Sequence, residues 1–121
     1  MRRENSTMRT QDDNRLSKMN LNKLLKFSTS NISDALDKLG IKGGCEGIRP
    51  LIKGVKAVGP AFTIKYRVAS LNPGTVGDYI DRCKPGDFIV IDNGGRTYCT
   101  VWGDILTHVA KKKGISGTVI D

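Results

Sequence analysis

Apolar residues recur at helical spacing in one stretch near the beginning of the chain. Four of them fall at positions i, i+3, i+4 and i+7 and predict one apolar helix face: Ile32, Ala35, Leu36 and Leu39. Ser28 to Asn31 precede this face and offer side-chain oxygens for the free amides of a first turn. Gly40 follows it and suits the end of a helix. The pattern therefore predicts a helix between Ser28 and Gly40.

A second helical pattern begins at about Gly103. Its apolar face is predicted from Ile105, Leu106, Val109 and Ala110. Lys111 to Lys113 complement the negative end of the helix dipole, and Gly114 ends the pattern. Two shorter helices are predicted, one from the spacing of Leu16, Met19, Leu24 and Phe27, and one over Val76 to Arg82.

Other stretches follow the patterns of β-strands. Phe62, Ile64, Tyr66 and Val68 alternate with polar residues, which is typical of a half-buried strand. The apolar run from Phe88 to Ile91 predicts a strand buried on both faces, and Thr118 to Ile120 predict a second buried strand. Val55 to Val58 also indicate the start of a strand, which Gly59 and Pro60 interrupt.

The order of these elements indicates an α/β fold. Residues 88–120 read as a strand, a helix and a strand, and parallel strands need such a helical crossover. Residues 1–14 are polar, charged and without periodicity, so we expect a mobile basic and polar tail there. Residues 15–121 are expected to form one domain.

Composition narrows the class of protein. The chain has 121 residues, a net charge of +8 and no apolar run long enough to cross a membrane. Seven of its Lys and Arg residues lie among the first 26 positions, but no arginine-rich run is interleaved with aromatic residues, so nucleic acid is not the expected partner. Cys45, Cys83 and Cys99 match no zinc spacing, so free thiols in a cytoplasmic protein are expected.

Polar residues collect where the predicted strands end. In open α/β sheets ligands bind beyond the carboxyl ends of the strands. This edge is expected to gather Asp92, Asn93, Gly103, Asp104 and Asp121. The free amides of a first helical turn can bind a small carboxylate, and Asp104 could reach a hard cation directly or through water. The spacing alone leaves a second reading open, in which Asp104 only favours the helix start.

Several blocks of the sequence resemble the RraA-like family. They are Ser28 to Leu36, Gly59 to Thr63, Pro85 to Asp92, Trp102 to Leu106 and Ala110 to Asp121. The family includes 4-hydroxy-4-methyl-2-oxoglutarate and 4-carboxy-4-hydroxy-2-oxoadipate aldolases, which also decarboxylate oxaloacetate, and the regulator of ribonuclease activity A. The resemblance implies a swivelling β/β/α domain, here truncated after the βαβ unit.

The resemblance also implies roles for individual residues. Asp104 matches the acidic catalytic residue of the aldolases, and the turn formed by Gly103, Asp104, Ile105 and Leu106 matches the amides that bind the carboxylate of a 2-oxo acid. The family's Arg-Asp pair, which contacts substrate and holds Mg²⁺ or Mn²⁺, would follow four residues after Asp121. The main metal ligand is therefore expected beyond this chain, which we expect to be a fragment. A homotrimer or a dimer of trimers is implied as well.

Two functions follow from the resemblance. One is a metal-dependent lyase of the class II pyruvate aldolase type, with Asp104 positioning a water that moves the proton. The other is a regulator that inhibits a ribonuclease by protein contact. Three further residues near the site could contribute to it: Arg96, Trp102 and His108. The simpler expectation is that Arg96 belongs only to the loop, that Trp102 packs in the core, and that His108 lies on the surface.

Overall fold

The computed structural model describes residues 21–69 and 74–121, which belong to two compact units, Met1–Gly43 and Gly44–Asp121. Within the described residues, no helix is long and apolar enough to cross a membrane. The expected tail over residues 1–14 lies outside the described residues, as do Leu16 and Met19 of the first predicted helix.

The first unit contains a short 3₁₀ helix, η1 (Leu21–Lys26), and the α-helix α2 (Thr29–Lys38). The Ser28 side chain accepts a hydrogen bond from the Asn31 amide, and the Asn31 side chain accepts one from the Ser28 amide. This reciprocal capping satisfies two of the amides that a helix start leaves free. Gly40 adopts a φ of 69°, where glycine is favoured. The predicted helix between Ser28 and Gly40 is confirmed.

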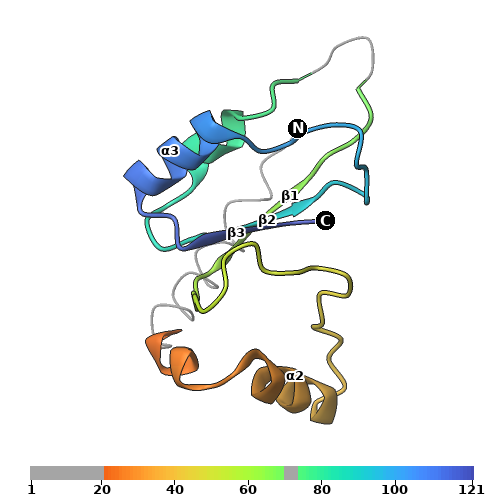
Figure 1. The fold of residues 1–121 in the computed structure, drawn as a ribbon, viewed down its shortest axis with the longest axis vertical. Coiled ribbons are helices and arrows are strands. Elements are labelled where there is room, and N and C mark those ends of the chain that lie inside the picture. The colour runs from red at the N-terminus through yellow and green to blue at the C-terminus, as the bar shows by residue number, and fades with distance from the viewer. Residues whose placement is uncertain (1–20, 70–73) are drawn as a thin grey trace, which may run out of the picture. The chain divides into compact units, whose positions relative to one another are not determined.

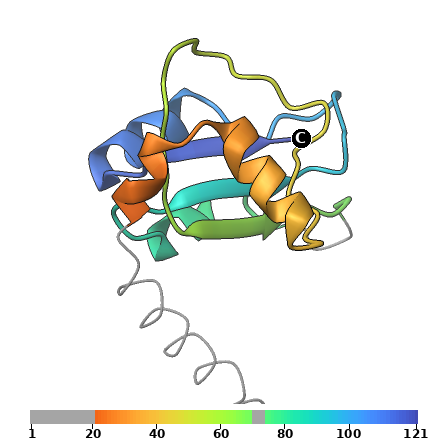
Figure 2. The same ribbon diagram turned by 90° about the horizontal axis from the view of Figure 1, so that it is seen from below.

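The second unit is built on a parallel sheet of three strands, β1 (Ala61–Lys65), β2 (Phe88–Asp92) and β3 (Gly117–Ile120), with β2 in the centre (Figures 1 and 2). The register aligns Ile64 with Ile91, and Ile91 with Ile120. All three strands therefore end at one edge of the sheet. The α/β class and the βαβ unit predicted from the sequence are confirmed.

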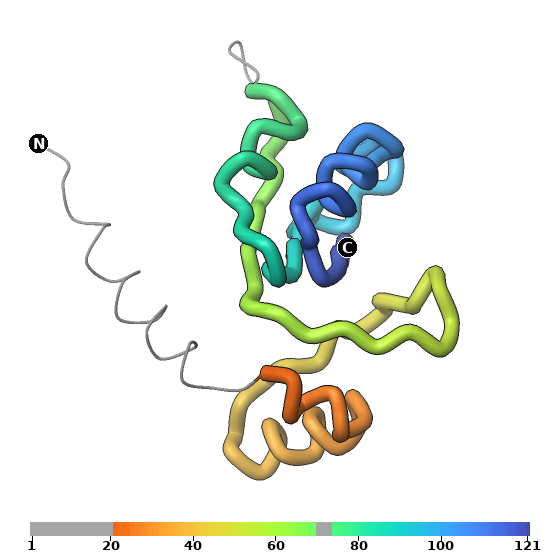
Figure 3. The backbone as a smooth tube through the Cα atoms, turned by 90° about the vertical axis from the view of Figure 1, so that its left-hand side faces the viewer, coloured from red at the N-terminus to blue at the C-terminus, as the bar shows by residue number. Residues whose placement is uncertain are grey.

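One face of the sheet carries the core. The 3₁₀ helix η2 (Asp78–Arg82) and the α-helix α3 (Asp104–Lys113) lie on the same side of the sheet (Figure 1), and their backbones run close to each other (Figure 3). Ile89 and Ile91 are 0% and 2% exposed and point toward these helices. The rest of the buried cluster is Tyr79, Ile80, Cys83, Val101 and Ala110.

Four predictions about the elements need correction. The strand predicted through Val68 ends at Lys65, and Val68 is 76% exposed. Residues 55–58 form no strand, because no neighbouring strand pairs with them, and Val55 is exposed. The central strand is buried on one face only, since Phe88 and Val90 remain half-buried on the other. Ile105 is 74% exposed rather than part of the buried helix face, because that face is centred on Leu106, Val109 and Ala110 and Ile105 lies at its margin.

The predicted state of the cysteines is confirmed. Cys45 and Cys99 are free and exposed, and Cys83 is free and buried. Burial raises the pKa of the Cys83 thiol, which keeps it in its neutral, unreactive form.

Candidate functional site

The carboxyl edge of the sheet is held together by hydrogen bonds from the loop that follows β2. The carboxylate of Asp121, directly after β3, accepts hydrogen bonds from the backbone amides of Asn93 and Gly95. Gly94 and Gly95 have φ values of 67° and 65°, which few other residues adopt without strain. The ends of β2 and β3 are thus joined through one carboxylate.

Asn93 is the buried polar residue of this loop, with 2% of its surface exposed. Its side-chain amide donates to the Arg96 carbonyl at 2.7 Å, and its side-chain oxygen accepts from Arg96 Nη2 at 3.2 Å. Arg96 Nη2 also donates to the Tyr66 carbonyl at 3.0 Å, just after β1. Arg96 therefore connects the loop to the residue that follows β1.

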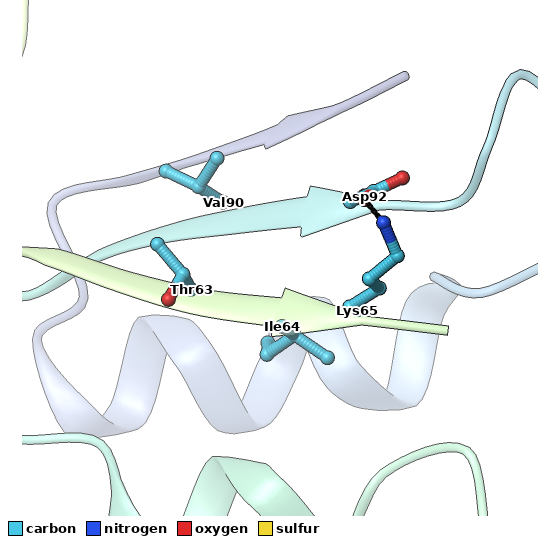
Figure 4. Close-up of a pocket in the computed structure, with 5 residues that line it drawn as sticks. All are labelled: Thr63, Ile64, Lys65, Val90 and Asp92. Atoms are coloured by element: carbon cyan, nitrogen blue, oxygen red, sulfur yellow. Dashed lines mark ion pairs between the residues drawn. The ribbon is translucent and has the colours of Figure 1, made fainter. Parts of the chain in front are cut away.

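A charged pair lies at the same edge of the sheet. Lys65 Nζ is 2.7 Å from Asp92 Oδ2, across β1 and β2. Figure 4 shows the pair beside a shallow cavity of about 300 Å³, which Thr63, Ile64 and Val90 also line. The hydrogen bond with Lys65, helped by the Gly94 amide, lowers the pKa of the Asp92 carboxyl below its ordinary range. Asp92 is consequently engaged in holding the strand ends.

The first turn of α3 presents a different chemistry. Gly103 is its N-cap residue, and no side chain caps the helix there. The Ile105 amide donates to Asp104 Oδ1 at 2.9 Å. An amide of this turn thus already holds a carboxylate oxygen, as the partial positive charge of a helix N-terminus favours.

Gly103 leaves open space in front of this turn. Its backbone is extended, with φ −165° and ψ −171°, so any residue could adopt it. Among the residues that the structure describes, a Cβ atom built on Gly103 would meet no atom within 4 Å. Neither backbone conformation nor packing within this chain requires glycine here, which fits a position that a ligand or partner approaches closely.

Two hydroxyl groups fix the approach to this turn. Thr107 Oγ1 donates to the Gly103 carbonyl at 2.7 Å and accepts a hydrogen bond from Trp102 Nε1 at 2.9 Å. Thr100 Oγ1 donates to the Trp102 carbonyl at 2.9 Å. Trp102 is half-buried and packs against the core cluster, so it anchors the turn to the core.

The structure brings together only part of the predicted edge cluster. Asp92 and Asp121 both accept hydrogen bonds from amides of the loop after β2, which contains Asn93. Asp104 instead accepts a hydrogen bond from the Ile105 amide within its own turn. His108 is exposed, as expected for a surface residue. The assignment of the turn as a 2-oxo acid site remains a prediction.

The donor groups present do not by themselves fit a divalent cation. Within residues 21–69 and 74–121, no three or more His, Cys, Asp or Glu side chains lie close enough together to hold a metal ion. Mg²⁺ and Ca²⁺ sites need several oxygen ligands, and Asp104 alone does not supply them. A metal site in this chain stays a prediction.

Sequence patterns did not indicate Thr107, nor the pairing of Lys65 with Asp92. Thr107 lies four residues after Gly103, a spacing that lets a hydroxyl reach back to the preceding turn, and this was the available signal. The pair of Lys65 with Asp92 depends on the register of β1 against β2, which a single sequence does not reveal.

Known proteins resemble this chain over the same region. The model of the RraA-like family Aldolase/RraA matches residues 29–121. The protein DlpA of Legionella pneumophila is 46% identical over 104 residues, which are 83% of this chain and 17% of DlpA. A protein of Halalkalibacterium halodurans named "Putative 4-hydroxy-4-methyl-2-oxoglutarate aldolase" is 40% identical over 93 residues, which are 77% of this chain and 42% of that protein.

Solved structures agree with the sequence relatives. An uncharacterized protein from Pseudomonas syringae pv. tomato matches with a TM-score of 0.75 and 46% identity, over 83% of this chain and 45% of that one. Streptomyces coelicolor RraAS2, described as an unusual member of the RNase ES inhibitor RraA protein family, matches with a TM-score of 0.75 and 27% identity, over 84% of this chain and 52% of that one. This chain therefore spans about half or less of each of these relatives.

The family model covers residues 29–121, and the structure matches a solved member of the RraA family with a TM-score of 0.75. The chain belongs to the RraA-like, Aldolase/RraA family.

Proposed function

We propose that this chain carries the carboxylate-binding half of a lyase of the class II pyruvate aldolase type. Its substrates would be 2-oxo acids such as 4-hydroxy-4-methyl-2-oxoglutarate, cleaved by retro-aldol reaction, and oxaloacetate, which is decarboxylated. The observation that carries the proposal is the first turn of α3, where the Ile105 amide holds a carboxylate oxygen and Gly103 leaves space in front of it.

The residues of the turn bind and orient the substrate. The amides of Asp104, Ile105 and Leu106 point toward the 2-oxo carboxylate, and each such charge-assisted hydrogen bond is worth about 1.5–3 kcal/mol. A substrate carboxylate that takes the Ile105 amide releases Asp104 from it. The freed carboxylate then holds a water molecule that carries the proton to or from the substrate carbon.

A divalent cation, Mg²⁺ or Mn²⁺, belongs to the proposal through the family resemblance. If bound, such an ion would supply Lewis-acid chemistry at the keto oxygen. In the family pattern its ligand is the Asp of an Arg-Asp pair, whose place is beyond Asp121. A homotrimer or a dimer of trimers is proposed on the same resemblance.

A second function is favoured by one relative. RraAS2 is described as an unusual member of the RNase ES inhibitor RraA protein family, and its structure matches 84% of this chain with a TM-score of 0.75. Inhibition of a ribonuclease through protein contact would need no carboxylate-binding turn. Asp104 within the Gly103–Leu106 turn favours the lyase over this alternative.

The deciding experiment measures pyruvate release. The product of the whole reading frame that encodes this chain is incubated with oxaloacetate or 4-hydroxy-4-methyl-2-oxoglutarate, with Mg²⁺ and with EDTA. Release that requires Mg²⁺ and is lost in Asp104→Ala supports the lyase. No release from either substrate, together with inhibition of a ribonuclease by the same preparation, would establish the regulator instead.

A further inference from the structure

We propose that Thr107 is a positioning residue for the candidate anion site, because its hydroxyl joins the Trp102 indole to the Gly103 carbonyl and so sets the direction of the turn's amides. This inference rests on the proposed function, since it assigns the turn a carboxylate ligand. Thr107 itself touches no part of the proposed substrate.

The Gly103 carbonyl is held by two donors from the same residue. The Thr107 amide donates to it at 3.0 Å, and Thr107 Oγ1 donates to it at 2.7 Å. A trans peptide is planar, and its C=O and N–H groups point in opposite directions. When the Gly103 carbonyl is fixed along α3, the Asp104 amide is fixed pointing out of the helix N-terminus, toward the proposed carboxylate.

The same hydroxyl holds the residue before the turn. Trp102 Nε1 donates to Thr107 Oγ1 at 2.9 Å, while the Trp102 carbonyl accepts from Thr100 Oγ1 at 2.9 Å. The indole packs against the core cluster. The hydroxyl is thus donor and acceptor at once, and it connects the turn to a side chain that the core keeps in place.

An ordinary helical threonine explains only half of this arrangement. Threonine hydroxyls often bond to the carbonyl four residues earlier, with no further role. The indole bond is the additional observation, because it gives the hydroxyl a second partner outside the helix. If the hydroxyl has a purely local role, its loss should leave the NMR signals of the Trp102 indole and of the turn amides unchanged.

Three variants separate these possibilities. Thr107→Val keeps the shape and β-branching but removes the hydroxyl, and Thr107→Ser restores the hydroxyl. Thr97→Val makes the same chemical change at an exposed threonine of the preceding loop. All three are compared with the wild-type chain by the temperature midpoint of unfolding, so that a folding defect is recognised separately.

The first readout is independent of any ligand. Trp102 is the single tryptophan, so its indole N–H gives one assignable NMR signal. In Thr107→Val we expect this proton to exchange with water at least about fivefold faster, on the basis of one lost hydrogen bond. The amide signals of Asp104 and Ile105 should shift with it, while Thr107→Ser and Thr97→Val stay close to wild type.

The second readout uses oxalate as the probe. Wild-type amide signals of the turn should titrate with oxalate, and Thr107→Val should bind it about five- to tenfold more weakly, with rescue by Thr107→Ser. If oxalate does not shift the wild-type amide signals of the turn, the proposed carboxylate site is refuted. The positioning role of Thr107 is then decided by the first readout. If Thr107→Val leaves the indole and turn signals unchanged, or if Thr107→Ser fails equally, the positioning role is refuted.

Discussion

Replacing Gly103 with serine should separate the stability of α3 from its ability to bind an anion. Gly103 is the N-cap residue of α3, with an extended backbone that serine adopts readily. The Cβ of serine would meet no atom within 4 Å. The chain already contains the matching arrangement, because Ser28 at the N-cap of α2 accepts a hydrogen bond from the Asn31 amide at 3.0 Å.

The substitution should raise the stability of the folded chain slightly and should weaken its binding of a carboxylate. Serine is a better N-cap than glycine by a few tenths of a kcal/mol, or roughly 0.3. For a domain of this size that raises the midpoint of thermal unfolding by about 1–3 °C. The serine oxygen would however occupy the Ile105 or Leu106 amide, and losing one charge-assisted hydrogen bond of about 1.5–3 kcal/mol weakens carboxylate binding about ten- to hundredfold.

Thermal unfolding and NMR titration with oxalate are the two measurements. Gly44→Ser serves as the matched control, because Gly44 also has an ordinary backbone and open space around its Cβ position. It should leave oxalate binding unchanged. Oxalate binding by Gly103→Ser as tight as that of wild type would falsify the assignment of these amides to the ligand. A marked fall in the unfolding midpoint would contradict the reasoning about the open space.

Three further changes test the fold and its electrostatics. Gly59→Ala should lower the free energy of unfolding by about 1–3 kcal/mol in urea titrations, because the new Cβ would lie 2.1 Å from the Gly86 carbonyl oxygen, whereas Gly44→Ala should change it little. Ser28→Ala should cost about 1 kcal/mol through loss of the cap, seen as faster amide hydrogen exchange at the start of α2; unchanged exchange would argue against the cap. The pKa of the Asp92 carboxyl is lowered from 3.8 in the folded chain, first by Lys65, so its stabilising effect is present above pH 3.8 and is lost as the pH falls below that value. The acid-induced loss of stability should accordingly be smaller in Lys65→Met, and an identical pH dependence in both proteins would show that the pair does not contribute.

Patterns that depend on neighbouring residues in the chain were predictable. The start of α2 at Ser28 and the end of α3 at Gly114 follow from local capping chemistry, and both are found in the structure. The central strand was visible as an apolar run, because β2 lies between two other strands and packs under α3. Local sequence patterns were therefore sufficient to predict most of the order of helices and strands.

Features that depend on distant residues were not predictable in the same way. Residues 55–58 have the composition of a strand, but a strand needs a neighbouring strand to pair with. The sequence does not show whether such a neighbour is present. Ile105 fits the helical period, yet it lies at the margin of the face that packs against the core and is exposed. At the candidate site, Gly103 and Asp104 could be singled out, whereas the bonds of Thr107 to Trp102 and of Asp121 to the loop after β2 required the structure.

The bonds between Asp121 and the loop after β2 also bear on how the chain folds. The Asn93 amide and its acceptor are 28 positions apart, and the Gly95 amide and its acceptor are 26 apart. Parallel strands offer no local hairpin from which pairing can begin, and contacts between distant residues slow folding. During synthesis the loop after β2 can therefore form its hydrogen bonds to Asp121 only after β3 and Asp121 have left the ribosome. Until then β2 can pair with β1 on one side only, and its other side is an unpaired strand edge of the kind that makes incompletely folded chains prone to aggregation.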